Sequence, residues 1–326
     1  MRLPRRRFLS LAAAGAAAPG FAGFAAAADY PTRLVRIFEG FGGGGTPDLI
    51  SRLFAQWLSE HLGQPFVVEN RTGAAGNLAT EAALHAAPDG YTLLTCLSAN
   101  AINASLYKNL KFDFPRDTQP VAGLISLPMV LLVNPDFQAK TFAEFLAYAK
   151  ANPGKIDMAT PGVGTPMHVA LELIKLSAGV DMTHVPYRGP AGAFTDLLAG
   201  RIQAFIITVP AAVGFVRNGK LRALAVTGAK RSEALPDVPT VAEFLPGFEA
   251  TAWDGTCAPK GTPPDVVAKL NAAIGAGLAD PAIKAKIKDL GADAMPMSPE
   301  QFGKFLTEET NKWAKVVAFS GAKPAQ

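Results

Sequence analysis

Two glycine-rich segments are the residues of this chain whose types and spacing point most clearly to chemistry. The first reads Gly40-Phe41-Gly42-Gly43-Gly44-Gly45-Thr46-Pro47-Asp48, and the second reads Pro161-Gly162-Val163-Gly164-Thr165-Pro166-Met167-His168. Glycines let the backbone approach a ligand, and the N–H groups at a helix start face it at the positive end of the helix dipole. Two such helix starts suit a carboxylate, whose oxygens accept several charge-assisted hydrogen bonds. The sequence therefore predicts an anion site made by both segments.

Each glycine segment lies between an expected strand and an expected helix. Thr46 and Thr165 are suited to the N-cap position, and the proline that follows each is suited to the first helical position. Asp48 adds a favourable negative charge in the first helical turn.

The first segment also permits a different reading. Its residues 40–45 satisfy G-x-G-x-x-G after a strand and before a helix, and Glu69 stands near the position of a ribose-binding acid. An exported oxidoreductase that carries a nicotinamide cofactor on a Rossmann fold therefore remains the alternative function.

Hydrolytic and metal chemistry find little support in the sequence. It contains no G-x-S-x-G and no H-E-x-x-H motif, and its histidines are not spaced as metal ligands. His168 lies in the first turn after the second segment, next to the expected anion site. A lone histidine in such a place is more often a packing or hydrogen-bonding residue than a catalyst. We expect neither a catalytic residue nor a metal site.

The elements that must position these segments alternate between strand and helix, the pattern of an α/β fold with parallel strands. We expect strands at 34–38, 65–69, 91–97, 121–126, 129–134, 156–159, 182–185, 204–208, 221–226 and 251–257. We expect helices at 47–61, 78–87, 142–151, 167–178, 191–198, 211–218, 265–278, 282–290 and 299–319. The proline-rich segment 232–248 is expected to be irregular.

The alternation of strands and helices restarts after Pro128, and 326 residues are enough for two domains. We therefore expect two lobes. The last helices have no sheet of their own, so we expect them to return to the first lobe. That return requires two chain crossings, near Pro128 and near Phe248, with a ligand cleft between the lobes. We expect lobe 1 to hold residues 29–128 plus 249–326, and lobe 2 to hold residues 129–248.

The first 28 residues read as an export signal. Arg5-Arg6-Arg7 precede a run of small and apolar residues, and three alanines end the segment at Ala28. The order R-R-x-F-L is twin-arginine-like, and an ordinary Sec signal is the alternative. Both place the protein in the periplasm, with cleavage near Ala28.

Composition excludes several classes of protein. Hydrophobic residues make up 49% and charged residues 18%, which is not the composition of a disordered chain. Four of the 31 basic residues lie in the leader, so 31 − 4 = 27 remain against 27 acidic ones, and no overall basic character favours nucleic acid. Cys96 and Cys257 are expected to be buried thiols, although a bridge between them stays open.

The chain resembles the periplasmic receptors of tripartite tricarboxylate transporters, also called Bug receptors. The resemblance runs from about Tyr30 to the C-terminus and includes both glycine segments, the segments 67–71, 86–94 and 149–155, and His184-Val185-Pro186-Tyr187-Arg188-Gly189. Its most specific part is Leu221-Arg222-Ala223-Leu224-Ala225-Val226-Thr227, followed by 231–232 and 235–243.

The resemblance implies a two-lobed periplasmic binding protein, type II-like and clamshell in form, with two crossing strands. It implies no enzyme activity and no cofactor. Such a receptor closes on a small mono-, di- or aromatic carboxylate and delivers it to integral-membrane permease subunits; we expect a monomer. A receptor of the same fold that reports to a sensor kinase is a further alternative.

The resemblance also implies the ligand-binding residues. They are Gly43, Gly44, Gly45, Thr46, Pro47, Asp48, Ser98, Asn100, Gly162, Val163, Gly164, Thr165, His168, Tyr187, Arg188, Ile207, Thr208 and Trp253. Where the family often has Asp-Asn-Leu-Pro, this chain has Ile207-Thr208-Val209-Pro210, so no carboxylate there could pair with a ligand amine. Asn100 replaces a frequent histidine, and Asp254 replaces a frequent aromatic or aliphatic residue.

Overall fold

The computed structural model describes residues 30–187 and 189–324. The chain divides into two units, residues 1–30 and 31–326, and the account below concerns the second. The predicted signal segment with its cleavage near Ala28 lies outside the described residues, and so does Arg188.

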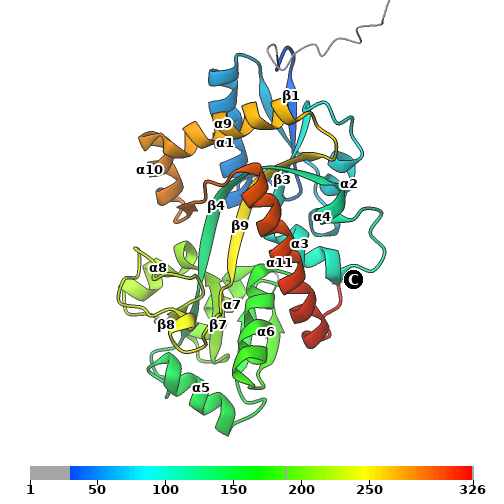
Figure 1. Ribbon diagram of the computed structural model, residues 1–326. Coiled ribbons are helices and arrows are strands. Elements are labelled where there is room, and N and C mark those ends of the chain that lie inside the picture. Colours follow the sequence, from blue (N-terminus) through cyan, green and yellow to red (C-terminus); the bar gives the residue numbers. More distant parts are fainter. Residues whose placement is uncertain (1–29, 188, 325–326) are drawn as a thin grey trace, which may run out of the picture. The chain divides into compact units, whose positions relative to one another are not determined.

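The described strands form one mixed sheet (Figure 1). Its order is β2 (Phe66–Asn70), β1 (Val35–Glu39), β3 (Thr92–Leu97), β9 (Thr251–Pro259), β4 (Thr118–Val133), β7 (Ala204–Thr208), β5 (Asp157–Thr160) and β6 (Thr183–Pro186). Two more strands, β8 (Arg222–Val226) and β10 (Asp293–Ala294), also pair with β4. We call β1, β2 and β3 the first half of the sheet, and β5 to β8 the second half.

Strand directions decide where the loops of each half lie. The strands β1, β2 and β3 are parallel, β9 is antiparallel to β3, and β4 is antiparallel to β9. Hence β4 runs in the direction of the first half and continues into the second half, where β7 is antiparallel to it and β5 and β6 follow β7. The carboxyl ends of β1 to β3 and of β5 to β7 therefore point toward each other along β4.

The strand β4 corrects one prediction. Segments 121–126 and 129–134 were predicted as two strands that meet at Pro128, but they form one continuous strand of 16 residues. Pro128 is opposite Thr251, at the end of the β9 ladder, and from Met129 onward β4 pairs with β7 and β8 instead. A proline is accepted here because the strand changes partners at this point, so the missing N–H disrupts neither ladder.

The described helices follow the predicted pattern with two additions. They are α1 (Thr46–Leu62), α2 (Asn77–Leu84), α3 (Ser98–Leu106), α4 (Phe114–Asp117), α5 (Phe142–Ala151), α6 (Pro166–Ala178), α7 (Pro190–Leu198), α8 (Val209–Arg217), α9 (Pro264–Ala279), α10 (Pro281–Asp289) and α11 (Pro299–Ser320). Short 3₁₀ turns stand at Ala74–Gly76 and Val241–Glu243. The additions are α3 and the single turn α4. The residues of α3 carry no amphipathic stripe because seven of the nine are buried.

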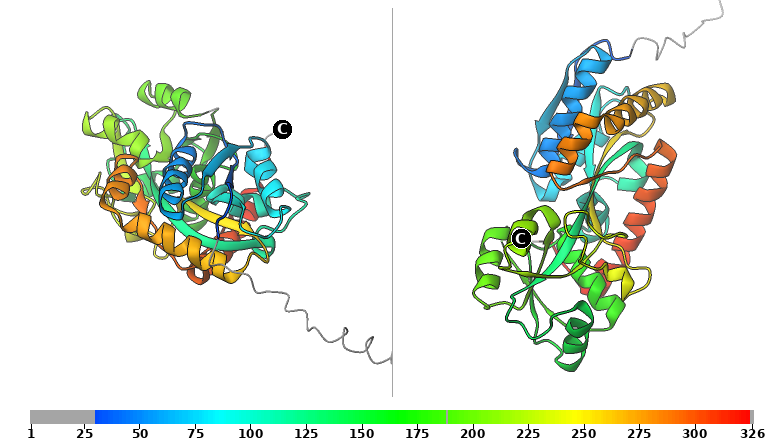
Figure 2. Two further views of the ribbon diagram at one scale, coloured as in Figure 1. Left: turned by 90° about the horizontal axis from the view of Figure 1, so that it is seen from above. Right: turned by 90° about the vertical axis from the view of Figure 1, so that its left-hand side faces the viewer.

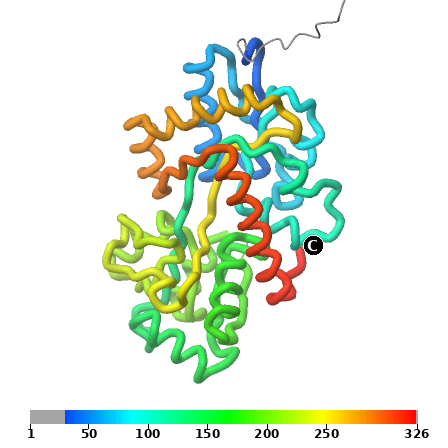
Figure 3. Tube along the Cα trace, viewed as in Figure 1, coloured from blue at the N-terminus to red at the C-terminus, as the bar shows by residue number. Residues whose placement is uncertain are grey.

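Helices cover both faces of the first half. On one face α1 packs beside α9 (Figure 2). Trp57 Nε1 of α1 donates there to the Ala273 carbonyl of α9 at 2.8 Å. On the other face, Trp253 of β9 is fully buried against α11. Of the C-terminal helices, α9 packs on α1 and on β4, whereas α11 packs on α3 and also on α6 of the second half (Figure 3).

A disulfide joins Cys96 of β3 to Cys257 of β9, whose Cα atoms are 6.0 Å apart. The expectation of two free thiols was wrong. The strands β3 and β9 are far apart in the sequence but adjacent in the sheet, and their register places the two cysteines diagonally across the ladder.

In the described part of the chain no single helix has the length and apolar composition to cross a membrane. Taken together, α9 and α10 reach that length and apolar composition, but the two helices are bent by 74° relative to each other.

Candidate functional site

The first glycine loop follows β1 and is exposed from Phe41 to Gly45. Two carboxylates of the protein hold it from below: the Phe41 N–H donates to Glu39 Oε2 at 2.8 Å, and the Gly44 N–H donates to Asp48 Oδ2 at 2.9 Å. The helix α1 starts at Thr46 with Gly45 as its N-cap. The prediction of Thr46 as N-cap was therefore wrong by one residue, because Asp48 binds the loop backbone in place of a threonine hydroxyl.

Asp48 is a structural anchor of this loop. Its side chain is 3% exposed and accepts from Arg52 Nε at 2.9 Å and from Asn70 Nδ2 at 2.8 Å. The Arg52 hydrogen bond, more than any other cause, lowers the pKa of Asp48 to about 2. Asp48 is thus ionised and bound by protein donors, which leaves it little capacity to contact a ligand.

Backbone contacts also fix the base of the loop. A Cβ on Gly40 would lie 2.6 Å from the Gly76 Cα, so no larger residue fits where these two segments meet. Gly76 ends a turn in which Ala74 and Ala75 both have positive φ, at 47° and 53°. Such backbone is strained for alanine and is held here by the Asn103 Nδ2 group, which donates to the Ala75 carbonyl at 2.9 Å.

The second glycine loop follows β5 and was correctly predicted in its capping. Thr165 is the N-cap of α6, and its hydroxyl accepts from the His168 N–H at 3.2 Å and donates to the Gly162 carbonyl at 2.8 Å. Gly164 has a φ of +79°, which an L side chain rarely adopts. The half-buried residues 161–167 present their backbone at the carboxyl edge of the second half.

His168 secures this loop from inside. The Gly164 N–H donates to His168 Nδ1 at 3.2 Å, and the ring is stacked on His184 with centroids 4.2 Å apart. Burial is the main cause that lowers the pKa of His168 to about 3 and that of His184 to about 4. Both rings are therefore neutral near pH 7, and His168 Nδ1 is free to accept. Its role in the structure is to hold Gly164 in place.

The helix α3 connects the edges of the two halves. It starts directly after β3, where Ser98 is buried and Asn100 Oδ1 accepts the Leu97 N–H at 2.7 Å. It ends at Leu106, and a Cβ placed on Gly164 would lie 2.8 Å from Leu106 Cδ2. Asn100 also donates through Nδ2 to Thr80 Oγ1 at 2.8 Å, so both polar atoms of its side chain bind within the protein.

The remaining predicted residues occupy different environments. Tyr187 is half-buried after β6 and donates its hydroxyl to Asp196 at 2.7 Å, while burial, the largest cause, raises its pKa to about 12. Thr208 is half-buried at the end of β7, next to the buried Ile207. Trp253 is 0% exposed and donates to Glu309 Oε2 at 2.9 Å, which places it in the core.

Among the described residues, one edge of each half carries the predicted residues other than Trp253. The loop after β1 and the start of α3 stand at the carboxyl ends of the first half. The loops after β5, β6 and β7 stand at the carboxyl ends of the second half, which face the first half along β4. Sequence reasoning missed the residues that hold the loops from beneath, among them Glu39, Arg52 and Asn70, since only their contacts across strands reveal them.

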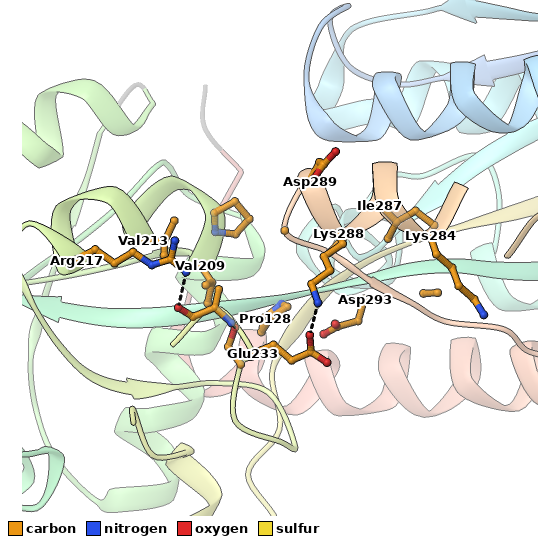
Figure 4. A pocket seen from close by; sticks show the side chains of 16 residues that line it. Pro128, Val209, Val213, Arg217, Glu233, Lys284, Ile287, Lys288, Asp289 and Asp293 are labelled. Carbon is orange, nitrogen blue, oxygen red and sulfur yellow. Dashed lines mark hydrogen bonds and ion pairs between the residues drawn. The ribbon is translucent and has the colours of Figure 1, made fainter. Parts of the chain in front are cut away.

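A pocket of about 580 Å³ lies beside Pro128, where β4 passes from one half to the other (Figure 4). Pro210 of α8 lines it from the second half, and the residues after α10 line it from the first. Lys288 Nζ bridges to Glu233 Oε2 at 2.7 Å across it, but both side chains are more than 70% exposed, so the pair adds little stability. None of the predicted ligand-binding residues that the structure describes lines this pocket.

The acidic, histidine and cysteine side chains of the described residues are not clustered as metal ligands. Within residues 30–187 and 189–324, no group of three or more histidine, cysteine, aspartate or glutamate side chains could hold a metal ion. Glu69, the acid of the dinucleotide reading, lies 3.1 Å from the Arg71 guanidinium and 3.8 Å from that of Arg36.

Comparisons with known proteins agree with this arrangement. Residues 50–321 match the family model of the tripartite tricarboxylate transporter family receptor. Protein BugT of Bordetella pertussis is 37% identical over 316 residues, which cover 96% of this chain and 95% of that protein.

Solved structures of similar proteins have the same fold. An R. palustris protein solved with adipate is 34% identical, with a TM-score of 0.76, and the match covers 91% of this chain and all of that one. MatC from Rhodopseudomonas palustris, with bound malate, is also 34% identical, with a TM-score of 0.72, over 88% of this chain and all of that one. The predicted α/β fold of a two-lobed periplasmic binding protein is thereby confirmed. The chain belongs to the family of tripartite tricarboxylate transporter receptors, which are periplasmic solute-binding proteins.

Proposed function

We propose that this protein captures a small carboxylate in the periplasm, between the two halves of its sheet, and delivers it to a membrane permease. The observation that carries the proposal is the placement of two glycine loops, each at a helix start, on edges that face each other along β4. Relatives with the same fold hold adipate and malate, which are both dicarboxylates. Binding would select the closed arrangement of two lobes, residues 29–128 plus 249–326 and residues 129–248.

The ligand's carboxylate is assigned to backbone N–H groups of the two loops. In the first loop these are Gly43, Gly45 and Thr46, because the Gly44 N–H already donates to Asp48. In the second loop they are Val163 and Thr165, because the Gly164 N–H donates to His168. Neither loop brings a cation to the carboxylate, which fits recognition by dipoles and hydrogen bonds.

The other predicted residues divide into contact and positioning roles. Pro47, Ser98, Gly162, Tyr187, Arg188 and Thr208 are proposed to line the distal part of the ligand site. Asp48, Asn100, Gly164, His168, Ile207 and Trp253 are proposed to position the loops and strands, since the structure uses their polar groups or buries their side chains.

The proposed ligand class follows from the absence of an acidic side chain at positions 207 and 208. Ile207 and Thr208 provide no carboxylate at the end of β7, so a ligand amine would find no partner there. We therefore propose a carboxylate without an amine, either dicarboxylic or aromatic.

A thermal-shift screen of the mature chain tests this function. Ligand bound to the folded state alone, at 100 times its dissociation constant, stabilises it by about 2.7 kcal/mol. The panel contains adipate, malate, tricarboxylates, aromatic acids, amino acids, NAD and NADP. A shift with one carboxylate class supports the proposal, whereas a shift with only NAD or NADP refutes it in favour of the oxidoreductase.

The variant Gly164→Leu is expected to lose carboxylate binding in the same thermal-shift assay. Its side chain would meet Leu106 Cδ2, so the second loop must move and the shift with the active carboxylate should disappear. Gly42→Ala is the control, because a Cβ there meets nothing within 4 Å. Uptake of the same carboxylate by cells that lack the gene then distinguishes a permease partner from a sensor kinase.

A further inference from the structure

Two buried carboxylates lie under the first glycine loop without a cation bound to either. Glu39 is 0% exposed and Asp254 is 3% exposed. One oxygen of each, Glu39 Oε1 and Asp254 Oδ2, is buried and has no hydrogen-bond partner. Buried charges are normally paired, so this arrangement requires a physical reason.

The sheet register places both carboxylates on one face. Phe38 is opposite Leu94, so Glu39 lies beside Thr95; Thr95 is opposite Thr256, and Leu97 is opposite Asp254. Because alternate residues of a strand share a face, Glu39, Thr95, Thr256 and Asp254 point to the same side. The helix α1 covers this side, as the 2.7 Å contact between Ser51 Oγ and Thr95 Oγ1 shows.

The charged groups around the pair are few. From β1 comes Glu39, from β9 comes Asp254, and from α1 come Asp48 and Arg52. The Arg52 guanidinium is bound to Asp48, so it does not compensate either buried carboxylate directly. A second negative charge at Asp254 would thus stand in the interior beside Glu39.

Hydrogen-bond donors distinguish the two groups. Burial, the largest cause, raises the pKa of Glu39, but Glu39 Oε2 accepts from the Phe41 N–H at 2.8 Å and from Asn70 Nδ2 at 3.0 Å, and both hydrogen bonds oppose this rise by favouring the ionised form. Asp254 has no such donor in the hydrogen bonds of the described residues, so burial and the neighbouring charge act on it unopposed. The geometry points to Glu39 as the ionised member and to Asp254 as the member that holds a proton.

We propose that Asp254 is a protonated carboxylic acid in the folded receptor and that carboxylate capture at the first glycine loop is coupled to the retention of this proton. The coupling rests on the proposed function. An anion bound at the loop adds negative charge above Glu39, so the ligand binds best when Asp254 is neutral. Burial, followed by the charge of Glu39, raises the pKa of Asp254 to about 8, which agrees with this assignment.

The first test needs no ligand. Urea unfolding is measured from pH 5 to 9.5 for the wild type, Asp254→Asn and Glu39→Gln, with Glu308→Gln, a substitution of an exposed acid, as control. A carboxyl whose pKa is raised on folding loses stability as pH rises from its unfolded value to its folded value. The stability of Asp254→Asn relative to wild type should therefore increase with pH up to about 8 and then level off. In Glu39→Gln the loss of stability with rising pH should end at a lower pH than in the wild type, since removal of the charge beside Asp254 lowers the pKa of Asp254.

The second test uses adipate and malate as probes. Calorimetric titration at pH 8 in phosphate and in Tris reports protons taken up with the ligand, because the two buffers differ in ionisation enthalpy. Wild-type affinity should fall by up to about tenfold per pH unit above the titration of Asp254, and Asp254→Asn should remove both the proton uptake and this fall.

Different results would overturn different parts. Parallel pH profiles for wild type and Asp254→Asn would show that Asp254 does not hold the proton. The expected profiles with pH-independent affinity would remove the coupling alone. If neither probe binds at any pH, adipate and malate are not ligands of this protein and the proposed coupling is refuted for them. The unfolding curves still show whether Asp254 is protonated in the folded protein.

Discussion

Replacing Gly164 with alanine should destabilise the folded protein by an amount that the local geometry fixes. Gly164 has a φ of +79°, and holding an L-residue in that left-handed region costs about 1–2 kcal/mol. The new Cβ would also lie 2.8 Å from Leu106 Cδ2. Because that atom ends a flexible side chain, Leu106 can turn away at a cost of about 0.5–1.5 kcal/mol. The free energy of unfolding should fall by roughly 1.5–3.5 kcal/mol in total.

Two glycines of the first loop, Gly44 and Gly42, allow the backbone cost to be measured apart from the cost of moving Leu106. Gly44 has a φ of +87° but nothing within 4 Å of its Cβ position, so Gly44→Ala should show the backbone cost alone, about 1–2 kcal/mol. Gly42 has neither constraint, and Gly42→Ala should be neutral or stabilising by up to about 1 kcal/mol through the unfolded state.

The assay is urea unfolding followed by tryptophan fluorescence, which the three tryptophans of the chain make possible. The order of stability should be Gly42→Ala, then Gly44→Ala, then Gly164→Ala. If Gly164→Ala is as stable as Gly42→Ala, then the contact between the second glycine loop and α3 does not constrain the protein, and our reasoning about the loop fails.

Three further predictions concern the interior. Because the pKa of His168 is lowered to about 3, the free energy of unfolding should fall as pH decreases from about 6.5 toward 4, and His168→Gln should flatten this fall in urea titrations. Glu309→Leu should cost about 3 kcal/mol or more, seen in chemical unfolding, because the indole N–H groups of Trp253 and Trp313 both lose their acceptor; Glu309→Gln, which keeps an acceptor, should cost less. Replacing both disulfide cysteines with alanine should lower stability by up to about 5 kcal/mol, the loop-entropy value for their separation of 161 residues, and an unchanged midpoint under reducing conditions would contradict it.

The fold was largely predictable because its information is local. Thr165 and Pro166 mark the start of α6 at the position where the helix begins, and the alternation of strands and helices gives the parallel units. The helix α3 was not predictable in this way, since a helix buried nearly all round has no stripe to detect. Pro128 similarly suggested a break, because the change of strand partners that accommodates it depends on distant strands.

The two glycine loops were predictable in position, because each stands before a helix, but the contacts of the residues in them were not. The glycine runs identified both loops, yet Asp48 and His168 proved to bind loop backbone, which depends on side-chain geometry that spacing does not encode. Trp253 illustrates the same limit, because its side chain lies in the core on the α11 face. Contacts across the sheet, including the disulfide, require the order of strands and so remained open.

The disulfide makes the middle of the chain a covalently closed loop. Residues 97–256 begin and end at the bridge between β3 and β9, and they include the whole second half of the sheet. A protease that cuts once anywhere in this stretch, for example in the exposed segment 229–231, produces two fragments that each keep one of the bridged cysteines. The nicked receptor would therefore migrate as two fragments only after reduction, and the two glycine loops of the proposed ligand site would stay attached to each other after the backbone is broken.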